Sequence, residues 1–241
     1  SQMYTHSLGK FSPQFRALDL PFLFKDDNHA ERVLDGEIGK DILSTLAAQK
    51  ETKNVKGLAF TYSGGYRVIG SDEPILTLQE LQDKRIVVSN PITLGTTIES
   101  MGGRAIPVPP NLWNKYDLIG KGQADAVETT YLRFDGKHIL KTNHSMFMTT
   151  IVVSNKFWNS LTDQQQQAFR DAALVTSRKE REWSVQDAEK FEQQALENGV
   201  TITDISEEET QSLKRKSQIT YVKTKHYFSP DLVKRIRETR H

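Results

Sequence analysis

Short apolar stretches alternate with amphipathic stretches through the middle of the chain. Residues 55–62 are apolar, β-branched or aromatic at most positions, which predicts a buried strand that stops at the Ser-Gly-Gly sequence 63–65. Residues 67–88 follow with the pattern of a strand, a turn, a short helix and a second strand, and helices are expected over 94–101 and 112–120. Such alternation is typical of an α/β fold with a mainly parallel sheet.

A different pattern covers residues 161–198. Thr162 and Asp163 are suited to opening a long helix, and Gly199 is suited to ending it. The apolar residues between them fall roughly on one stripe, which the charged sequence SRKERE at 177–182 interrupts. We therefore expect that turn to face solvent on all sides, in either one bent helix or two abutting helices.

Composition narrows the class of protein. The chain has 241 residues, no cysteine and a formal net charge of +1. Its length allows one large domain or two lobes of about 100–150 residues each. The lack of cysteine excludes thiolate metal sites, disulfides and cysteine nucleophiles, and no apolar run approaches the ~18 residues of a membrane span.

The C-terminal residues 214–241 are strongly basic, with nine Lys and Arg against two acidic residues. Segments of this kind bind nucleic acid or anionic lipid in some proteins. Here Leu232, Val233 and Ile236 fall at helical spacing, and no RNA- or DNA-binding motif accompanies them. The sequence predicts an amphipathic helix with a solvated basic face and no nucleic-acid partner.

No catalytic motif is present. The chain lacks a nucleophile elbow, a phosphate-binding loop, a dinucleotide fingerprint and the i, i+4 histidine pairing of a metal site. Asp125 and Glu128 are interpreted as turn and edge residues of a strand, not as an acid/base pair. We therefore expect no enzyme activity, no metal and no cofactor.

A binding function fits the turns that follow the predicted strands. Ligands of open α/β sheets bind at the carboxyl ends of strands. Arg67 follows a glycine pair at such a place, and a guanidinium there suits a carboxylate because its planar fork donates two charge-assisted bonds. The alternative is a surface arginine paired with a neighbouring acid.

A series of segments resembles a known family. In order along the chain they are LDLPFLF at 18–24, SGGYRVI, PILTLQELQDKRIVVSN, MGGRAIPVP, GKGQADAVETT, TNHSMF and NKFWNSLTDQQQQAF. Together they cover roughly residues 10–200. On these segments the chain resembles the DctP-like solute-binding subunits of tripartite ATP-independent periplasmic (TRAP) transporters.

The resemblance implies a two-lobed periplasmic-binding-protein-like α/β fold, with a long helix that spans both lobes. Lobe one is expected to hold residues 1–63 and about 148–187, and lobe two about 64–147 and 188–241. A small organic acid would be captured between the lobes by hinge closure and passed to membrane permease subunits. The protein would act as a monomer in the periplasm and catalyse nothing.

The resemblance also implies ligand-binding residues. Arg67 sits where the family keeps an arginine, Asn90 matches a polar residue after the central strand, and His144 matches a cleft histidine. Thr129, Trp113 and Tyr4 complete the predicted site.

Two departures from the family pattern bear on the ligand. Val87 stands where an arginine usually pairs with the ligand carboxylate, and Thr129 stands in place of an asparagine. Arg85 is expected on the same face of the strand as position 87, close to the start of the strand. The chain also begins close to LDLPFLF, so we expect it to be a fragment that lacks N-terminal strands and a signal peptide. An alternative function is a ligand sensor or scaffold with the same fold and no role in transport.

Overall fold

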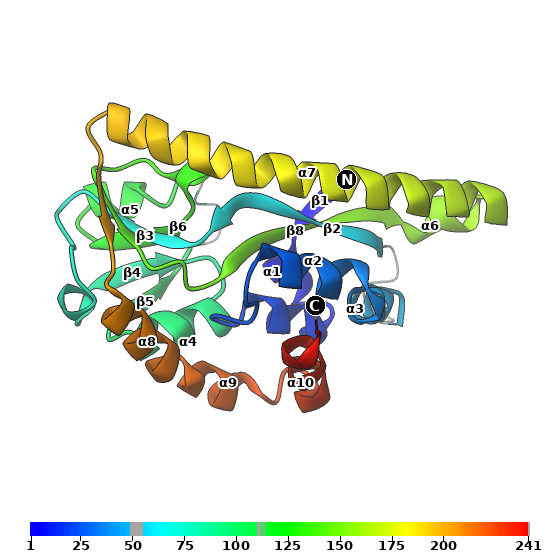
Figure 1. The fold of residues 1–241 in the computed structure, drawn as a ribbon, viewed down its shortest axis with the longest axis horizontal. Helices are drawn as coiled ribbons and strands as arrows, with labels where there is room; N and C mark the ends of the chain where they lie inside the picture. The colour runs from blue at the N-terminus through cyan, green and yellow to red at the C-terminus, as the bar shows by residue number, and fades with distance from the viewer. Residues whose placement is uncertain (49–54, 110–111, 113, 241) are drawn as a thin grey trace.

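The computed structural model describes residues 1–48, 55–109, 112 and 114–240. Its strands form two separate sheets, and one long helix runs past both of them (Figure 1). The fold is therefore a mixed α/β fold, as the alternating pattern predicts.

The smaller sheet has three antiparallel strands in the order β1-β8-β2. They are β1 (Gln2–Tyr4), β8 (Met146–Ser154) and β2 (Val55–Tyr66). Around it lie α1 (Thr5–Leu8), the 3₁₀ helix η1 (Pro13–Asp19), α2 (Asp27–Asp35), α3 (Glu37–Ala48) and α6 (Asn155–Asn159). Apolar side chains of these elements form the largest of the hydrophobic clusters, which includes Phe15, Leu46 and Phe60.

The larger sheet has six strands in the order β5-β4-β6-β3-β7-β9. The pairs β4–β5, β4–β6 and β7–β9 are parallel, whereas β3 runs antiparallel to both β6 and β7. The bounds are β3 (Val68–Ser71), β4 (Arg85–Val88), β5 (Arg104–Pro107), β6 (Ala126–Thr129), β7 (His138–Lys141) and β9 (Thr201–Asp204). Its short helices are η3 (Gln79–Leu81), α4 (Thr93–Ser100), α5 (Asp117–Gly120), η4 (Tyr131–Arg133), α8 (Glu207–Lys216) and α9 (Gln218–Thr224).

Two short crossings join the sheets, one from β2 to β3 at Arg67 and one from β7 to β8 at residues 142–145. The crossings are bonded to each other, because the Arg67 N–H donates to the Ser145 carbonyl at 2.8 Å. β2 does not stop at the Ser-Gly-Gly sequence. It continues through a bulge in which Gly64 and Gly65 have φ values of 88° and 77°, a region that favours glycine.

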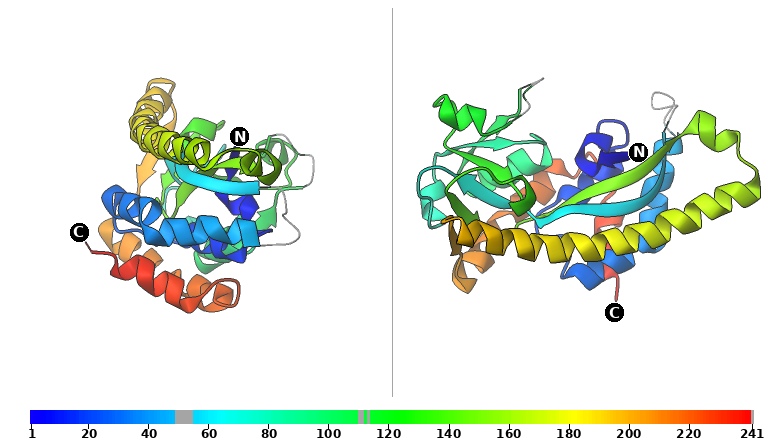
Figure 2. Two further views of the ribbon diagram at one scale, coloured as in Figure 1. Left: turned by 90° about the vertical axis from the view of Figure 1, so that its right-hand side faces the viewer. Right: turned by 90° about the horizontal axis from the view of Figure 1, so that it is seen from above.

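The long helix α7 (Asp163–Glu197) is continuous over 35 residues. Thr162 caps it in a reciprocal capping box with Gln165. Figure 2 shows from above that α7 runs along both sheets. It contacts β2 in the smaller sheet and β9 and η4 on the other side, so the predicted helix spanning two lobes is present.

The helix docks through only part of the predicted apolar stripe, in which Ala173 is buried and Phe191 packs against a cluster of the larger sheet. Phe169 and Trp183 are exposed, and the side chains that α7 buries are Ala173, Ser177, Arg181 and Ser184. The expectation that residues 177–182 face solvent on all sides is therefore wrong. Arg181 is buried because its guanidinium donates to Asp35 of α2 and to the Phe60 carbonyl of β2.

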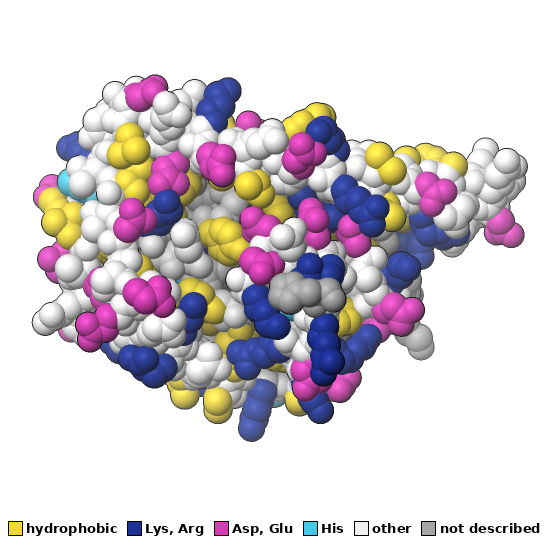
Figure 3. Space-filling view, in the orientation of Figure 1, with side chains coloured by type: hydrophobic (Ala, Val, Ile, Leu, Met, Phe, Trp, Pro, Cys, Tyr) yellow, Lys and Arg dark blue, Asp and Glu magenta, His cyan; other side chains and the backbone are white. Residues whose placement is uncertain are grey.

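The basic C-terminal segment includes the last residues of α8, then α9 and α10 (Pro230–Glu238), and Figure 3 shows its Lys and Arg side chains on the surface. In α10, Leu232 and Ile236 are buried and Val233 is half-buried, as the spacing predicts. These side chains join the core of the smaller sheet. α10 thus packs on the lobe-one side, whereas the predicted boundary places residues 188–241 in lobe two.

Candidate functional site

A buried ion pair lies where β2 crosses into the larger sheet. Arg67 Nη1 donates to Glu128 Oε1 at 2.6 Å, and both side chains are almost completely inaccessible to solvent. The pairing of Val68 with Thr129 in the sheet brings Arg67 to the end of β6, where Glu128 stands. Burial alone would raise the pKa of Glu128, but the charges of Arg67 and Lys115 outweigh it and keep this pKa below its usual range. Glu128 is therefore ionised at neutral pH.

The Arg67 guanidinium is only partly satisfied. Its Nε and Nη2 are buried and have no hydrogen-bond partner among the described residues. Buried polar groups are nearly always hydrogen-bonded, so two unpartnered donors on one cation mark a place that an acceptor would fill. Two parallel N–H groups of a guanidinium match the two oxygens of a carboxylate.

The Arg67 side chain lines a cavity of about 290 Å³, hereafter the Arg67 cavity. The cavity lies between segments of both sheets, and its lining residues are Tyr4, His6, Arg67, Ser89, Val108, Leu112, Lys115, Thr129, Thr130, Arg133 and Phe147. A hollow of this size, lined by mixed apolar and polar groups, suits a small solute.

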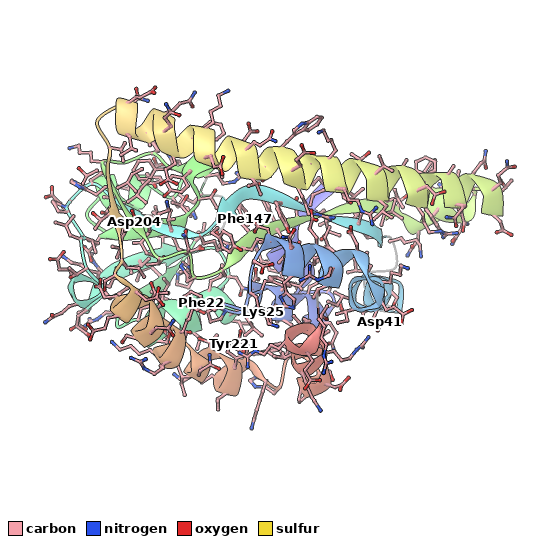
Figure 4. The ribbon with its side chains drawn as sticks, in the orientation of Figure 1. Phe22, Lys25, Asp41, Phe147, Asp204 and Tyr221 are labelled. Carbon is pink, nitrogen blue, oxygen red and sulfur yellow. The ribbon has the colours of Figure 1, made fainter. Side chains whose placement is uncertain are left out.

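Three rings form one wall of the cavity. Tyr4 and His6 each stack on Phe147, with ring centroids 5.4 Å and 6.0 Å away, and Phe147 projects from β8 (Figure 4). The guanidinium carbon of Arg67 lies 4.3 Å from the Phe147 centroid, and that of Arg133 lies 5.5 Å from it. Burial and the charge of Arg67 lower the pKa of His6 to about 3, so this ring is neutral at neutral pH. The wall offers an apolar face beside two cations.

Lys115 brings a further cation to the inner end of the cavity. Its Nζ donates to the main-chain carbonyl of Glu128. Burial lowers the pKa of Lys115 to about 8 in spite of the opposing charge of Glu128. Lys115 is thus still mostly protonated at neutral pH and close to its titration range.

Of the predicted site residues, the structure brings Arg67, Thr129 and Tyr4 together around the Arg67 cavity. Asn90 and His144 do not line this cavity, and Trp113 lies outside the described residues. The six residues stay a prediction as a ligand-binding set.

Asn90 is buried and does not line the Arg67 cavity. Its Nδ2 donates to Asp19 Oδ2 at 3.0 Å, and its Oδ1 accepts from the N–H groups of Ile92 and Thr93 at the start of α4. Burial raises the pKa of the Asp19 carboxyl to about 6, against the opposing effects of Arg67 and of this hydrogen bond. Asn90 thus links η1 to the helix that follows β4.

His144 is fully buried on the other side of the ion pair. Its Nδ1 lies 2.8 Å from Thr142 Oγ1, and its Nε2 lies 3.9 Å from Glu128 Oε1. Burial and the charge of Arg67 lower the pKa of His144 to about 4, although Glu128 opposes the shift. The ring is therefore neutral at neutral pH and forms no ion pair with Glu128.

The strand position that departs from the family pattern holds an apolar residue and is surrounded by apolar residues. Val87 is fully buried in a cluster with Tyr116, Leu118 and Val127. Arg85 cannot reach the cavity from the start of β4, because its guanidinium is held by both oxygens of Asp125 and by the Gly122 carbonyl. β4 itself therefore supplies no cation to the site.

Sequence reasoning missed Glu128, Lys115, Arg133, His6 and Phe147. Glu128 was interpreted as an edge residue, which is wrong, because it is buried in a strand between two others. A charged residue inside the apolar run Ala126–Thr129 was the available signal, since buried charges require partners. Lys115 and Arg133 carried no comparable signal, because nothing in the sequence says that their segments converge on one cavity.

A second hollow, hereafter the Phe22 groove, lies on the other side of the crossing strands. Its volume is about 760 Å³, and its lining includes Phe22, Lys25, His144, Met146 and Asp204 (Figure 4). Neighbouring residues of a strand point to opposite faces, so Met146 faces this groove while Phe147 faces the Arg67 cavity. We take the Arg67 cavity as the candidate site because it is lined by Arg67, whose Nε and Nη2 have no partner among the described residues.

No cluster of three or more His, Asp or Glu side chains able to hold a metal ion occurs in the part of the chain that the structure describes. None of its helices is both long and apolar enough to cross a membrane.

The model of one protein family, "Bacterial extracellular solute-binding protein, family 7" (DctP), matches residues 3–226. The chain belongs to this family. The resemblance and the fold class predicted from the sequence are thereby confirmed, and with them the class of extracytoplasmic solute-binding proteins.

Relatives and solved structures of the family agree. A "Solute-binding protein" of Chromohalobacter salexigens is 26% identical over 207 residues, which are 83% of this chain and 60% of that protein. The "C4-dicarboxylate-binding periplasmic protein DctP" of Rhodobacter capsulatus is 28% identical over 171 residues, which are 66% of this chain and 49% of that protein. A TRAP periplasmic solute binding protein from Bradyrhizobium sp., in complex with α/β-D-galacturonate, is 26% identical with a TM-score of 0.86, covering 99% of this chain and 79% of that one. The chain thus spans about half to 60% of the length of these two curated family members.

Proposed function

We propose that the chain is the solute-binding component of a TRAP-type transporter and captures a small organic acid in the Arg67 cavity. The observation that carries the proposal is the buried Arg67 guanidinium, whose Nε and Nη2 have no partner among the described residues while Nη1 is held by Glu128. Glu128 fixes the fork, and the two free donors match a carboxylate.

The remaining lining supports the same class of solute. Lys115 and Arg133 add positive charge, Thr129, Thr130 and Ser89 offer hydroxyl groups, and the Phe147 wall provides an apolar face for a carbon skeleton. The known partners of family members are consistent with this, since the Bradyrhizobium protein holds galacturonate and the Rhodobacter protein is named for C4-dicarboxylates. The proposed role is that of a receptor, so no reaction is assigned to the cavity.

Closure of the cavity would use the two crossings between the sheets. Arg67 and residues 142–145 lie at element ends, where a few backbone torsions absorb a hinge motion. In this proposal the closed monomer is then recognised by membrane permease subunits in the periplasm. A sensor or scaffold with the same fold would bind the solute equally well, and only transport in vesicles with the permease would separate the two.

The test is a thermal-shift and calorimetry screen with D-galacturonate and succinate. A bound solute at a hundredfold excess over its Kd stabilises the fold by about 2.7 kcal/mol. We expect such a shift for the wild type and its loss in the double variant Arg67→Gln/Glu128→Gln, which removes both buried charges together and so avoids leaving one unpaired.

The control is Arg85→Gln, which breaks an arginine–carboxylate pair of the same sheet at a distance from the cavity. It should bind as the wild type does. A folded wild type that responds to no carboxylate, or a double variant that responds fully, would contradict the proposal.

A further inference from the structure

Lys115 lines the Arg67 cavity, although nothing in the sequence around it indicates a binding role. It lies two residues before α5, in a segment that folds over β4 and β6, and its side chain is half-buried. The bond from Nζ to the Glu128 carbonyl uses one of the three ammonium hydrogens. The ammonium is therefore held beside the Arg67–Glu128 pair with donors to spare.

The charges around this place do not balance. Arg67, Lys115 and Arg133 line the cavity, and the carboxylates that act on Arg67 are Glu128 and Asp19. His6 and His144 are neutral at neutral pH for the reasons given above. Among the described residues, the cavity lining thus holds three cations and no carboxylate, and Glu128 pairs with Arg67, so Lys115 and Arg133 offer positive charge to a bound carboxylate.

The same segment covers the strand position where relatives of this kind are expected to carry an arginine. Tyr116, next to Lys115, packs on Val87 in one apolar cluster. Val87 pairs in register with Val127, which directly precedes Glu128. Lys115 therefore brings a cation from the segment before α5 to the neighbourhood of Val87, where β4 itself supplies no charge.

We propose that Lys115 is the second cationic group of the solute site and contacts the bound carboxylate alongside Arg67. This inference rests on the proposed function and adds a specificity-determining residue to it. The site thus uses a lysine from a covering segment together with an arginine from the crossing strand.

A lysine in this place links binding to protonation. Burial lowers the pKa of Lys115 to about 8, Arg67 and Arg133 act in the same direction, Glu128 acts against it, and His6 is neutral. A carboxylate bound to the ammonium raises this pKa again. Above about pH 8 the free protein has lost the proton, so binding must take one up and weakens as the pH rises.

The experiment is titration calorimetry with D-galacturonate and with succinate at about pH 6.5 and about pH 9.5, in buffers of different ionisation enthalpy. The wild type should take up close to no proton at the lower pH and a fraction approaching one proton at the higher pH, with weaker binding there. Lys115→Met should raise Kd about tenfold or more at the lower pH and abolish the proton uptake. Lys115→Arg should bind at both pH values without proton uptake.

The matched control is Lys121→Met, at an exposed lysine just after α5. It should leave Kd and proton uptake unchanged. Unchanged affinity in Lys115→Met, or a wild type that binds with no proton uptake at the higher pH, overturns the role of Lys115 and leaves the proposed function standing. A wild type that binds neither acid overturns the proposed function and this inference with it.

Discussion

Two buried arginines make different use of the same side chain. Arg181 of α7 and Arg67 at the crossing are 1% and 2% exposed, and each is paired with a carboxylate. Arg181 donates from Nη2 to both oxygens of Asp35 at 2.8 Å and from Nη1 to the Phe60 carbonyl at 2.8 Å, and its Nε lies 3.6 Å from Glu31 Oε1. Arg67 donates from Nη1 alone.

This difference suggests two roles: Arg181 is an anchor that holds α7 in place, and Arg67 belongs to the candidate solute site. Both terminal nitrogens of Arg181 donate to acceptors of the chain, so this guanidinium joins α7 to α2 and β2. Its buried Nε has no hydrogen-bond partner among the described residues, although Glu31 lies 3.6 Å away. Arg67 keeps two buried donors without a partner among the described residues. A buried charge is expensive unless it is paired and hydrogen-bonded, so the arginine with two unpartnered donors is the one that we propose as part of a ligand site.

Removal of the anchor should give the largest effect on stability. Arg181→Met leaves the Phe60 carbonyl without this donor and Asp35 with only Arg178, so the free energy of unfolding should fall by about 3 kcal/mol or more. Urea denaturation measures it. Lys179→Met, on the exposed face of the same turn, should stay within about 0.5 kcal/mol of the wild type. Loss of the response to D-galacturonate in Arg181→Met would break the distinction between anchor and site.

Asp19 provides a pH-dependent test of the charges near Arg67. Its pKa is raised to about 6 in the fold, so between about pH 4 and pH 6 the folded protein holds a proton that the unfolded chain has lost. The stability contributed by this group is therefore complete at low pH and is lost as the pH rises through about 6. Asp19→Asn should remove that loss, and its advantage over the wild type should grow by on the order of 1–3 kcal/mol from pH 4 to pH 7.

Thermal unfolding of both proteins across this pH range measures the difference. An advantage that stays constant with pH would mean that the Asp19 carboxyl is ionised in the fold throughout. The Asp19 carboxylate would then help to neutralise Arg67 at every pH, and the contrast between Arg67 and Arg181 would be weaker.

Replacement of each arginine by lysine separates the fork from the charge. Lysine keeps the charge but offers no planar pair of donors. Arg67→Lys should weaken carboxylate binding about tenfold, roughly 1.4 kcal/mol, with a small change in stability. Arg181→Lys should instead lower stability by about 1–2 kcal/mol and leave Kd unchanged. Calorimetry and urea denaturation of both variants test this, and equal effects at the two positions would contradict it.

The sequence was sufficient where local rules act. The α/β alternation, the cap at Thr162 and the apolar face of α10 follow from neighbouring residues and are present in the structure. The stripe on α7 was predicted only in part, because the buried face includes Ser177, Arg181 and Ser184 besides Ala173. Asp35 and Phe60, over a hundred residues earlier, provide the acceptors that make Arg181 suitable for burial.

The candidate site was predictable in part for the same reason. Arg67 could be found from its position after a glycine pair at the end of a strand. Lys115 could not be found in this way, because its proposed role depends on a hydrogen bond to the main-chain carbonyl of Glu128 and on the apolar surroundings of Val87. Such properties arise from packing and have no signature in the local sequence.

The bulge at the end of β2 has a consequence for how the site tolerates changes in chain length. Tyr62 pairs with Met148 and Tyr66 with Met146, so four steps along β2 match two steps along β8. The surplus is an even number, and both tyrosines consequently face the same side of the strand, where they line one small cavity beneath α7. Loss or gain of a single residue there would reverse every side chain that follows and turn Arg67 away from Glu128, whereas a change of two would preserve its direction. This turn must therefore conserve parity as well as its two glycines.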